Sequence, residues 1–419
     1  MKLTKSGDLS QAAADSRTLS ESKSTVRAQN TGIGSGIAAS SRPLSGSAGD
    51  YDGYRVYESI DSFIQPLERL SSIISAYLED HDQGPMRDEI LQFYFDISRF
   101  LTIYDLIDDH YVIYGETDDE GSFVLRLSCV DPSRNLSRCM AKGLSTILFS
   151  ATLLPVQYYK KLLGGTPEDF EIYARSVFDP SRLGIFIGSD VTSRYSRRSD
   201  TMYRKIAMYI DSVIRAKRGN YIVFFPSHQF LDEVRTTYED EFLDTDDTEL
   251  LIQSSFMTEE ARESFLDRFS AGNDIDLSGL IHMDIEITED KSVLGFCVMG
   301  GIFSEGIDLK NDSLIGVIIV GTGIPMVCNE REILRNYFDE KGVDGFDYAY
   351  RYPGMNKVLQ AAGRVIRTES DLGVALLLDD RFLGYGYKSL FPREWKGYKT
   401  VTTNSVKNDI TRFYSGFQG

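Results

Sequence analysis

Cysteine and histidine are scarce in this chain of 419 residues, which contains four of each. The cysteines form no CxxC pair and show no metal-ligand spacing, and the histidines are equally scattered. We therefore expect no metal site. Cys297 lies in an apolar stretch and is expected to be an inert core residue; the other cysteines are Cys129, Cys139 and Cys328.

Long apolar runs are absent as well. No run approaches about 18 residues, the length typical of a transmembrane helix, and no signal peptide opens the chain. Together with the scattered cysteines, this favours a protein of the reducing cytoplasm that has no membrane partner.

Positive charge is in the minority, because 45 Lys and Arg stand against 63 Asp and Glu, for a net charge of −18. This balance excludes a protein coated in basic surface. It does not exclude nucleic-acid binding, since a local basic groove can act while acidic surface elsewhere keeps the protein soluble.

Aromatic residues are missing from residues 1–50, which contain many serines and no Phe, Tyr or Trp. Such a segment cannot bury enough apolar surface to offset its ordering entropy, so we expect it to be disordered. Its "GIGSGIA" (32–38) follows no strand, and the chain has no GxGxxG loop after a strand, which argues against a Rossmann-type oxidoreductase.

The first ordered region is expected at residues 51–130. Apolar residues recur at helical spacing in 59–80 and again in 86–107, with "HDQGP" as a turn between them, which predicts a pair of helices. Residues 111–130 read as two strands joined by an acidic, glycine-containing turn, a β-hairpin.

From residue 131 to 419 strands and helices alternate. The strands are continuous apolar runs, as expected when both faces of a sheet are covered. We therefore predict an α/β fold with a doubly wound parallel sheet, in which ligands bind beyond the carboxyl ends of the strands. The predicted strands are 145–150, 221–225, 249–254, 293–300, 314–321 and 373–379, and the predicted helices are 155–163, 198–217, 227–237, 258–269, 329–340 and 355–367.

Short polar stretches follow these strands. "SAT", with Ser150 and Thr152, follows 145–150, and Ser227 follows 221–225 as a predicted helix N-cap. After 293–300 comes "GIFSEGIDL", a glycine-containing loop with Glu305 and Asp308. Each of these stretches taken alone has a structural explanation.

The stretch "LQAAGRVIRTES" (359–370) precedes the last predicted strand. If it is helical, one face carries residues at i, i+3, i+4 and i+7, namely Gln360, Gly363, Arg364 and Arg367. That face would hold two fixed positive charges at the mouth of the sheet.

The order SAT, FFPS, GxFSEGIDL and QxxGRxxR spans more than 200 residues with consistent spacing. With these motifs, residues 60–419 resemble the C-terminal half of a superfamily 2 helicase of the DinG/XPD type. The resemblance implies the second RecA-like lobe of an ATP-dependent 5′→3′ DNA helicase, with ATP and Mg²⁺ shared with a first lobe and single-stranded DNA running across both lobes.

The same resemblance implies roles for individual residues. Arg364 and Arg367 would reach the phosphates, with Gln360 nearby, and a fixed guanidinium stabilises the charge that builds during phosphoryl transfer. Gly363 would let the helix approach closely. The GxFSEGIDL stretch would link nucleotide to DNA through Glu305, Gly306 and Asp308.

A candidate DNA-binding segment lies in "SDVTSRYSRRSDTMYRK" (189–205). Arginines that track phosphates stand there beside tyrosines that can stack on bases, a combination suited to single strands; the alternative is a basic helix start on a surface. The DNA-binding candidates are Arg194, Tyr195, Arg197 and Arg198, together with Ser150, Thr152 and Ser227. His228 stands where relatives generally have tyrosine.

A Walker A loop and a DExH-type motif are not found in the sequence, and neither is the four-cysteine cluster of iron–sulfur relatives. We therefore expect no ATPase activity from this chain alone, a first lobe supplied in trans or lost by gene truncation, and a remnant of the inter-lobe insertion at 51–130. The alternative is an inactive module that binds single-stranded nucleic acid or a partner protein.

Overall fold

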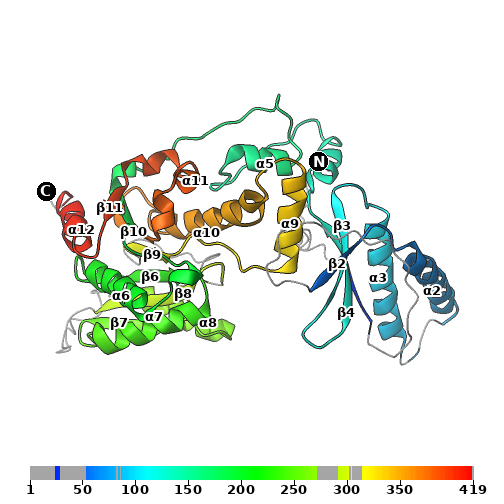
Figure 1. Ribbon diagram of the computed structural model, residues 1–419, viewed down its shortest axis with the longest axis horizontal. Helices are drawn as coiled ribbons and strands as arrows, with labels where there is room; N and C mark the ends of the chain where they lie inside the picture. The colour runs from blue at the N-terminus through cyan, green and yellow to red at the C-terminus, as the bar shows by residue number, and fades with distance from the viewer. Residues whose placement is uncertain are drawn as a thin grey trace, which may run out of the picture. The chain divides into compact units, whose positions relative to one another are not determined.

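The computed structural model describes residues 24–28, 53–81, 84, 86–270, 291–301, 303 and 314–417. The chain forms two compact units (Figure 1). The first, here called the hairpin unit, comprises residues 1–146, 160–166 and 327–345. The second, here called the sheet unit, comprises 147–159, 167–326 and 346–419.

The hairpin unit contains an antiparallel sheet of four strands in the order β1-β4-β3-β2. The predicted helix pair and β-hairpin are confirmed. Side chains such as Ile64, Phe100 and Leu127 form its core. Its elements are β1 (Ser24–Ala28), β2 (Tyr54–Tyr57), α2 (Asp61–Asp80), α3 (Arg87–Tyr104), β3 (Tyr111–Thr117), β4 (Phe123–Cys129), α4 (Ser133–Met140) and α9 (Asn329–Glu340).

Local chemistry sets the hairpin turn between β3 and β4. The Asp118 carboxylate accepts the backbone N–H groups of Glu120 at 3.0 Å and Ser122 at 2.9 Å. Gly121 takes a φ of 79°, which an L side chain rarely adopts. The sequence predicted this turn correctly because the acid and the glycine that stabilise it lie within the turn itself.

Two features of the hairpin unit differ from the expectations. Strand β1 lies within the segment expected to be disordered, and its backbone pairs with the edge of β4; the rest of residues 1–50 lies outside the described residues. Helix α9 was expected among the helices of the parallel sheet. It belongs to the hairpin unit, where the Asn329 side chain donates to Glu116 at 2.9 Å.

The sheet unit is built on seven parallel strands in the order β11-β5-β10-β9-β6-β8-β7. Five of the six predicted strands are confirmed, and every residue of β6 and β10 is buried, as their unbroken apolar sequences require. The strands are β5 (Leu183–Gly188), β6 (Tyr221–Phe225), β7 (Thr248–Ile252), β8 (Ser292–Val298), β9 (Gly316–Val320), β10 (Gly373–Leu378) and β11 (Lys399–Val401).

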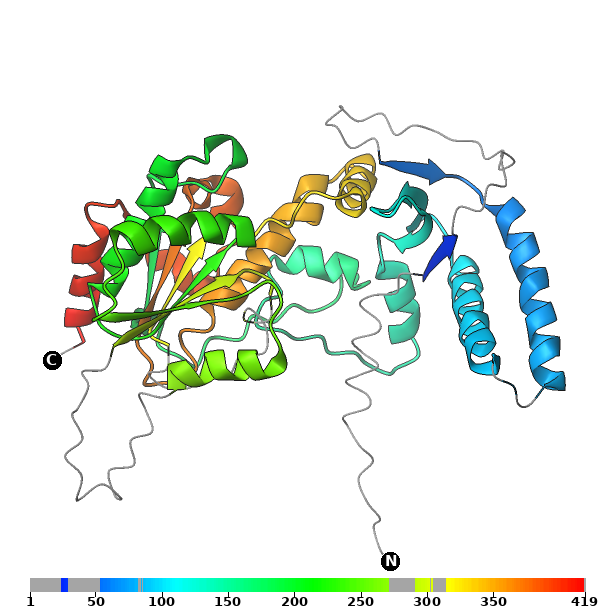
Figure 2. The same ribbon diagram turned by 90° about the horizontal axis from the view of Figure 1, so that it is seen from below.

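Helices cover both faces of this sheet (Figures 1 and 2), which confirms the doubly wound α/β fold. One core contains side chains from α8 and α10, and the other contains side chains from α6, α7 and α12. The helices are α5 (Val156–Leu162), α6 (Asp200–Ile214), α7 (His228–Glu241), α8 (Glu259–Ser270), α10 (Tyr352–Ala362), α11 (Tyr385–Lys388) and α12 (Val406–Ser415).

The predicted strand at 145–150 is wrong. This segment pairs with no strand of the described chain, and Ile147 and Phe149 are 83% and 90% exposed. The apolar sequence pattern was that of a covered strand, yet no described neighbour supplies either a hydrogen-bonding edge or a covering face.

Among the described residues, no helix is both long enough and apolar enough to cross a membrane.

Candidate functional site

The carboxyl ends of the parallel strands meet at one edge of the sheet, here called the carboxyl edge. A buried carboxylate, Asp379, follows β10 there and accepts five hydrogen bonds. Two come from Ser193, through its backbone N–H and its hydroxyl, both at 2.8 Å. Three come from Arg381, through its backbone N–H at 3.0 Å and two guanidinium nitrogens at 2.8 Å. Asp379 therefore joins the end of β10 to the loop that follows β5.

The surroundings of Asp379 keep it ionised. Burial alone would raise the pKa of this carboxyl, but the hydrogen bonds and charge of Arg381, with the backbone N–H groups of Ser193 and Arg381, outweigh burial and lower it. Ser193 also accepts a hydrogen bond from Arg381 at 2.8 Å, so the three residues form a closed network.

This network anchors the basic segment, defined as residues 194–198. Ser193 is buried, whereas Arg194, Tyr195 and Arg197 are exposed, and Tyr195 is 85% exposed. Arg198 lies over two rings, 5.3 Å from the centroid of Tyr195 and 4.9 Å from that of Phe230. The fold thus presents charge and an aromatic face together on a fixed backbone, as a surface for single strands requires.

One carboxylate, that of Asp380, partly neutralises the positive charge of the basic segment. Asp380 lies 3.3 Å from a guanidinium nitrogen of Arg197 and 4.0 Å from one of Arg194. These pairs are solvent-exposed, so they are weak and a phosphate can compete with the carboxylate. Sequence reasoning missed Asp379, Asp380 and Arg381, although "LLLDDRF" placed them directly after a buried strand at the ligand edge.

Ser227 is the N-cap of α7, as predicted. Its hydroxyl accepts the backbone N–H of Phe230 at 3.2 Å. Ser150 and Thr152 have hydroxyl oxygens 3.3 Å apart, but they follow no strand of the described sheet. Ser227 therefore lies at the carboxyl edge, whereas Ser150 and Thr152 do not follow a strand of this sheet.

The predicted helical face with the two arginines is wrong. Helix α10 ends at Ala362, and Gly363 is its exposed C-cap. Arg364 and Arg367 follow in a turn, so they do not share a helical face with Gln360. The carboxylate of Asp371 stabilises this turn by accepting the backbone N–H groups of Arg367 at 2.7 Å and Thr368 at 2.8 Å.

This arginine turn, residues 363–371, lies at the opposite edge of the sheet, where strands begin. Val365 packs so closely against Gly373, the first residue of β10, that a side chain at Gly373 would clash with it. Arg182 precedes β5 and donates to the Asp371 carbonyl at 2.9 Å. The arginines were expected at the mouth of the sheet with the strand ends, and the structure places the turn at the amino edge instead.

Helix α10 connects the two edges. Its first turn packs against the loop after β9, where Gly323 has a φ of 68° and any side chain would clash with the Gly354 carbonyl. Its last turn leads into the arginine turn. Gln360 is half-buried near that end of the helix. The predicted nucleotide-binding residues Glu305, Gly306 and Asp308 lie outside the described residues.

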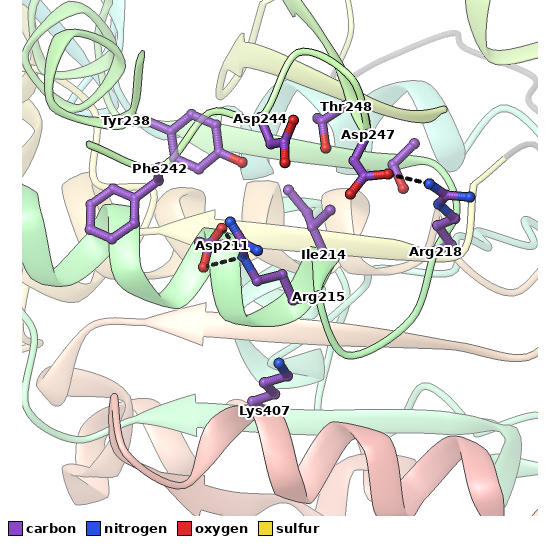
Figure 3. Close-up of a pocket in the computed structure, with 11 residues that line it drawn as sticks. Asp211, Ile214, Arg215, Arg218, Tyr238, Phe242, Asp244, Asp247, Thr248 and Lys407 are labelled. Atoms are coloured by element: carbon purple, nitrogen blue, oxygen red, sulfur yellow. Dashed lines mark hydrogen bonds and ion pairs between the residues drawn. The ribbon is translucent and has the colours of Figure 1, made fainter. Parts of the chain in front are cut away.

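A pocket of about 340 Å³ also lies at the amino edge, beside the first residues of β7 and β8 (Figure 3). Four of its charged groups form two pairs: Arg215 donates to Asp211 at 2.7 and 2.9 Å, and Arg218 pairs with Asp247. We assign no chemistry to this pocket. Within the described ranges, no group of three or more His, Cys, Asp or Glu side chains could hold a metal ion.

Comparison with known proteins points to one kind of domain. Residues 210–398 match the family described as "Helicase C-terminal domain". The ATP-dependent DNA helicase XPD of Sulfolobus acidocaldarius is 28% identical over 272 residues, which cover 63% of this chain and 43% of that protein. The ATP-dependent DNA helicase CHL1 of Eremothecium gossypii is 25% identical over 382 residues, which cover 86% and 44%. The chain spans less than half the length of these curated relatives.

Solved structures agree on the fold. The S. tokodaii Xpd4 structure matches with a TM-score of 0.51 at 15% identity, covering 86% of this chain and 63% of that chain. The structure named XPD_APO matches with a TM-score of 0.50 at 23% identity, covering 79% and 61%. Residues 210–398 thus match a helicase C-terminal domain, and the chain is similar to the C-terminal region of DinG/XPD-type superfamily 2 helicases.

Proposed function

We propose that this chain supplies the second motor lobe of an ATP-dependent 5′→3′ DNA helicase and works with a first lobe that carries the Walker A and DExH motifs. The observation that carries the proposal is the arginine turn within a helicase C-terminal domain. Its backbone is fixed by Asp371 and Arg182, so its two guanidinium groups start from a defined position.

The nucleotide would lie against the arginine turn. Arg364 and Arg367 would contact the phosphates and stabilise the charge that develops on the transferred phosphoryl group. The exposed Gly363 presents no side chain to obstruct that approach, and Gln360 would act beside the arginines. In this proposal Glu305, Gly306 and Asp308 connect the nucleotide to the DNA.

Single-stranded DNA would follow the carboxyl edge. The arginines of the basic segment would contact phosphates, and the exposed ring of Tyr195 would stack on a base. Ser227 would contribute the amino end of α7, where free backbone N–H groups favour a phosphate.

The residues fit one part of the cofactor and not the other. Guanidinium groups suit the phosphates of ATP. Mg²⁺ prefers carboxylate oxygens and water, and the described ranges contain no group of three candidate ligands. In this proposal the metal ligands come from the first lobe.

The test supplies the first lobe of the S. acidocaldarius helicase in trans and measures DNA-stimulated ATP hydrolysis. Arg364→Ala and Arg367→Ala should each reduce turnover by about 10³-fold, and Arg→Lys should rescue poorly because an ammonium cannot replace the planar fork. The control is Arg412→Ala, an arginine on α12 whose side chain is 73% exposed. Stable variants at Arg364 and Arg367 with full turnover would contradict the proposal.

The second candidate function is a module that binds single-stranded nucleic acid without catalysis. It is favoured by the basic segment, which needs no other lobe to present its charges. Under this function the chain would bind single-stranded DNA, and no first lobe would restore turnover.

A further inference from the structure

A second exposed aromatic side chain lies at the carboxyl edge, in the loop that follows β7. Phe256 is 97% exposed, although residues on both sides of it are fixed: Gln253 is buried and Met257 packs against the core of the sheet unit. A single exposed aromatic residue is ordinary on a protein surface, so the position of Phe256 and its surroundings decide what it can do.

The loop that carries Phe256 is held to the end of β8. The Gln253 side chain accepts the backbone N–H of Val298 at 2.8 Å, and the Gln253 N–H donates to the Phe296 carbonyl at 2.9 Å. Within the loop, the Ser254 hydroxyl donates to the Phe256 carbonyl at 2.8 Å. Because the backbone is already fixed, the ring can bind a ligand with little further loss of conformational entropy.

Positive charge lies beside this loop, over the first residues after β8. A Cβ at Gly300 would come within 2.9 Å of the Lys357 Nζ, so the ammonium group lies directly over this glycine. Gly300 is exposed and takes a φ of 78°, which L side chains rarely adopt. A Cβ at the next residue, Gly301, would come within 3.1 Å of the Gln253 Nε2. The Lys357 ammonium therefore neighbours the anchor of the Phe256 loop, and the two glycines between them let a phosphate approach the backbone closely.

Acidic side chains on the other side of the loop determine how a nucleotide would be oriented. Helix α8 begins with Glu259 and Glu260, both exposed, and Glu259 pairs with Arg262 at 2.7 Å. These carboxylates disfavour a phosphate on the α8 side of Phe256, whereas Lys357 favours one on the β8 side. A base stacked on the ring with its phosphate at the ammonium group satisfies both conditions.

The same combination of an exposed ring and positive charge occurs at the basic segment, where Tyr195 follows β5. Five inter-strand steps of about 4.8 Å separate β5 from β7, so the rings of Tyr195 and Phe256 lie about 24 Å apart along the carboxyl edge. A stacked strand rises about 3.4 Å per nucleotide, so about seven nucleotides span this distance. Single-strand grooves contact about 4–16 nucleotides, and the span lies within that range.

We infer that Phe256 and Lys357 form a second contact for single-stranded nucleic acid, in which the ring stacks on a base and the ammonium group binds the adjacent phosphate. The ligand is a strand of about seven or more nucleotides that also contacts the basic segment. This inference rests on the single-strand path of the proposed function. The other possible occupant of Phe256, a partner protein, becomes an outcome of the test.

The first experiment measures the affinity of the whole chain for oligothymidines by fluorescence anisotropy. Phe256→Ala should weaken binding of about 12 nucleotides about 5- to 150-fold, the loss of one base stack. Binding of about 4 nucleotides should change no more than about 2-fold, because so short a strand can still bind at the basic segment. Phe256→Tyr keeps the ring and should bind as the unchanged chain does. The matched control is Phe170→Ala, which removes a 99% exposed ring that precedes β5.

The second experiment tests the phosphate contact through its dependence on salt. Lys357→Ala should reduce the slope of log K against log salt by about 0.7 for the longer strand, the contribution of one phosphate, and Lys357→Arg should preserve the slope. The control is Lys407→Ala, an exposed lysine on α12, which should leave the slope unchanged. Circular dichroism checks that all variants are folded.

Photocrosslinking locates the second contact directly. The longer oligothymidine carries 5-iododeoxyuridine, which on irradiation couples to an aromatic ring that is stacked on it. Mass spectrometry of the digested complex then identifies the crosslinked peptides. We expect two of them, one that contains Tyr195 and one that contains Phe256.

Each outcome decides the inference. Unchanged affinity of folded Phe256→Ala for the longer strand, crosslinks at Tyr195 alone, or a slope unaffected by Lys357→Ala overturns it, and the first two leave Phe256 to a partner protein. Absence of single-strand binding overturns it as well. ATP hydrolysis restored by a first lobe, without a crosslink at Phe256, would leave the proposed function standing alone. A crosslink at Phe256 in a chain that no first lobe activates would leave the second contact standing alone.

Discussion

Replacing Asp379 should show how much one buried carboxylate stabilises the loops at the carboxyl edge. Asp379→Ala removes the acceptor of five hydrogen bonds and leaves the Arg381 guanidinium without its buried partner, although that side chain is only 19% exposed. Breaking a buried pair in this way costs about 3–5 kcal/mol, because the remaining charge is uncompensated. Asp379→Asn keeps the shape and one acceptor, so we expect about 1–3 kcal/mol.

The chain offers a selective probe for this measurement. Trp395 is its single tryptophan, and it is buried in the core of the sheet unit. Its fluorescence during urea unfolding therefore reports on the unit that contains Asp379, separately from the hairpin unit. The control is Asp246→Asn, an exposed carboxylate for which we expect a change within about 0.5 kcal/mol.

The affinity for single-stranded DNA provides a second measurement of the role of Asp379. If Asp379 holds the basic segment through Ser193, the folded Asp379→Asn variant should bind a single strand more weakly than the unchanged chain. If Asp379→Ala lowered the free energy of unfolding by less than about 1 kcal/mol, the conclusion that Asp379 holds the carboxyl edge together would be contradicted. That decrease is well under the cost of breaking a buried ion pair.

Three further outcomes follow from the described contacts. The pKa of Asp379 is lower in the folded chain than its unfolded value of about 3.9, so ionised Asp379 stabilises the fold above that pH. This stabilisation is lost as the pH falls through the folded pKa. Asp379→Asn should therefore make the free energy of unfolding, followed by Trp395 fluorescence, depend less on pH in the acid range. Burial raises the pKa of the Cys297 thiol, so a thiol reagent should label the exposed Cys139 quickly and Cys297 only after unfolding. Changing the three arginines of the basic segment to Ala should reduce the slope of log K against log salt by about 2, and an unchanged slope would mean that they are only surface.

The parallel sheet was predictable because its signal is local. The segments that became β6, β8, β9 and β10 are unbroken apolar runs, and such runs are stable only when covered on both faces. Strand β5, "LGIFIG", was missed although it is buried and as long as β10. The three-residue β11 carries too little pattern to be recognised.

The arginine turn could not be predicted from spacing alone. A helix that continued through Arg367 would satisfy the same sequence, since residues 355–367 contain no proline and their only glycine is Gly363. The helix ends because Asp371 draws the backbone of Arg367 and Thr368 into a turn, and because Val365 packs against the start of β10. The Asp371 hydrogen bonds are local and the Val365 contact joins the turn to β10, and a helical pattern encodes neither.

The two candidate sites therefore stand at opposite edges of one sheet. The basic segment follows β5 at the carboxyl edge, and the arginine turn precedes β10 at the amino edge, with α10 between them. Helix α10 touches the loop after β9 through Gly354 and ends at the arginines, so it is the element through which the two edges can be coupled. Under the proposed function, nucleotide and DNA would bind at these opposite edges, and α10 would be the rigid connection between them.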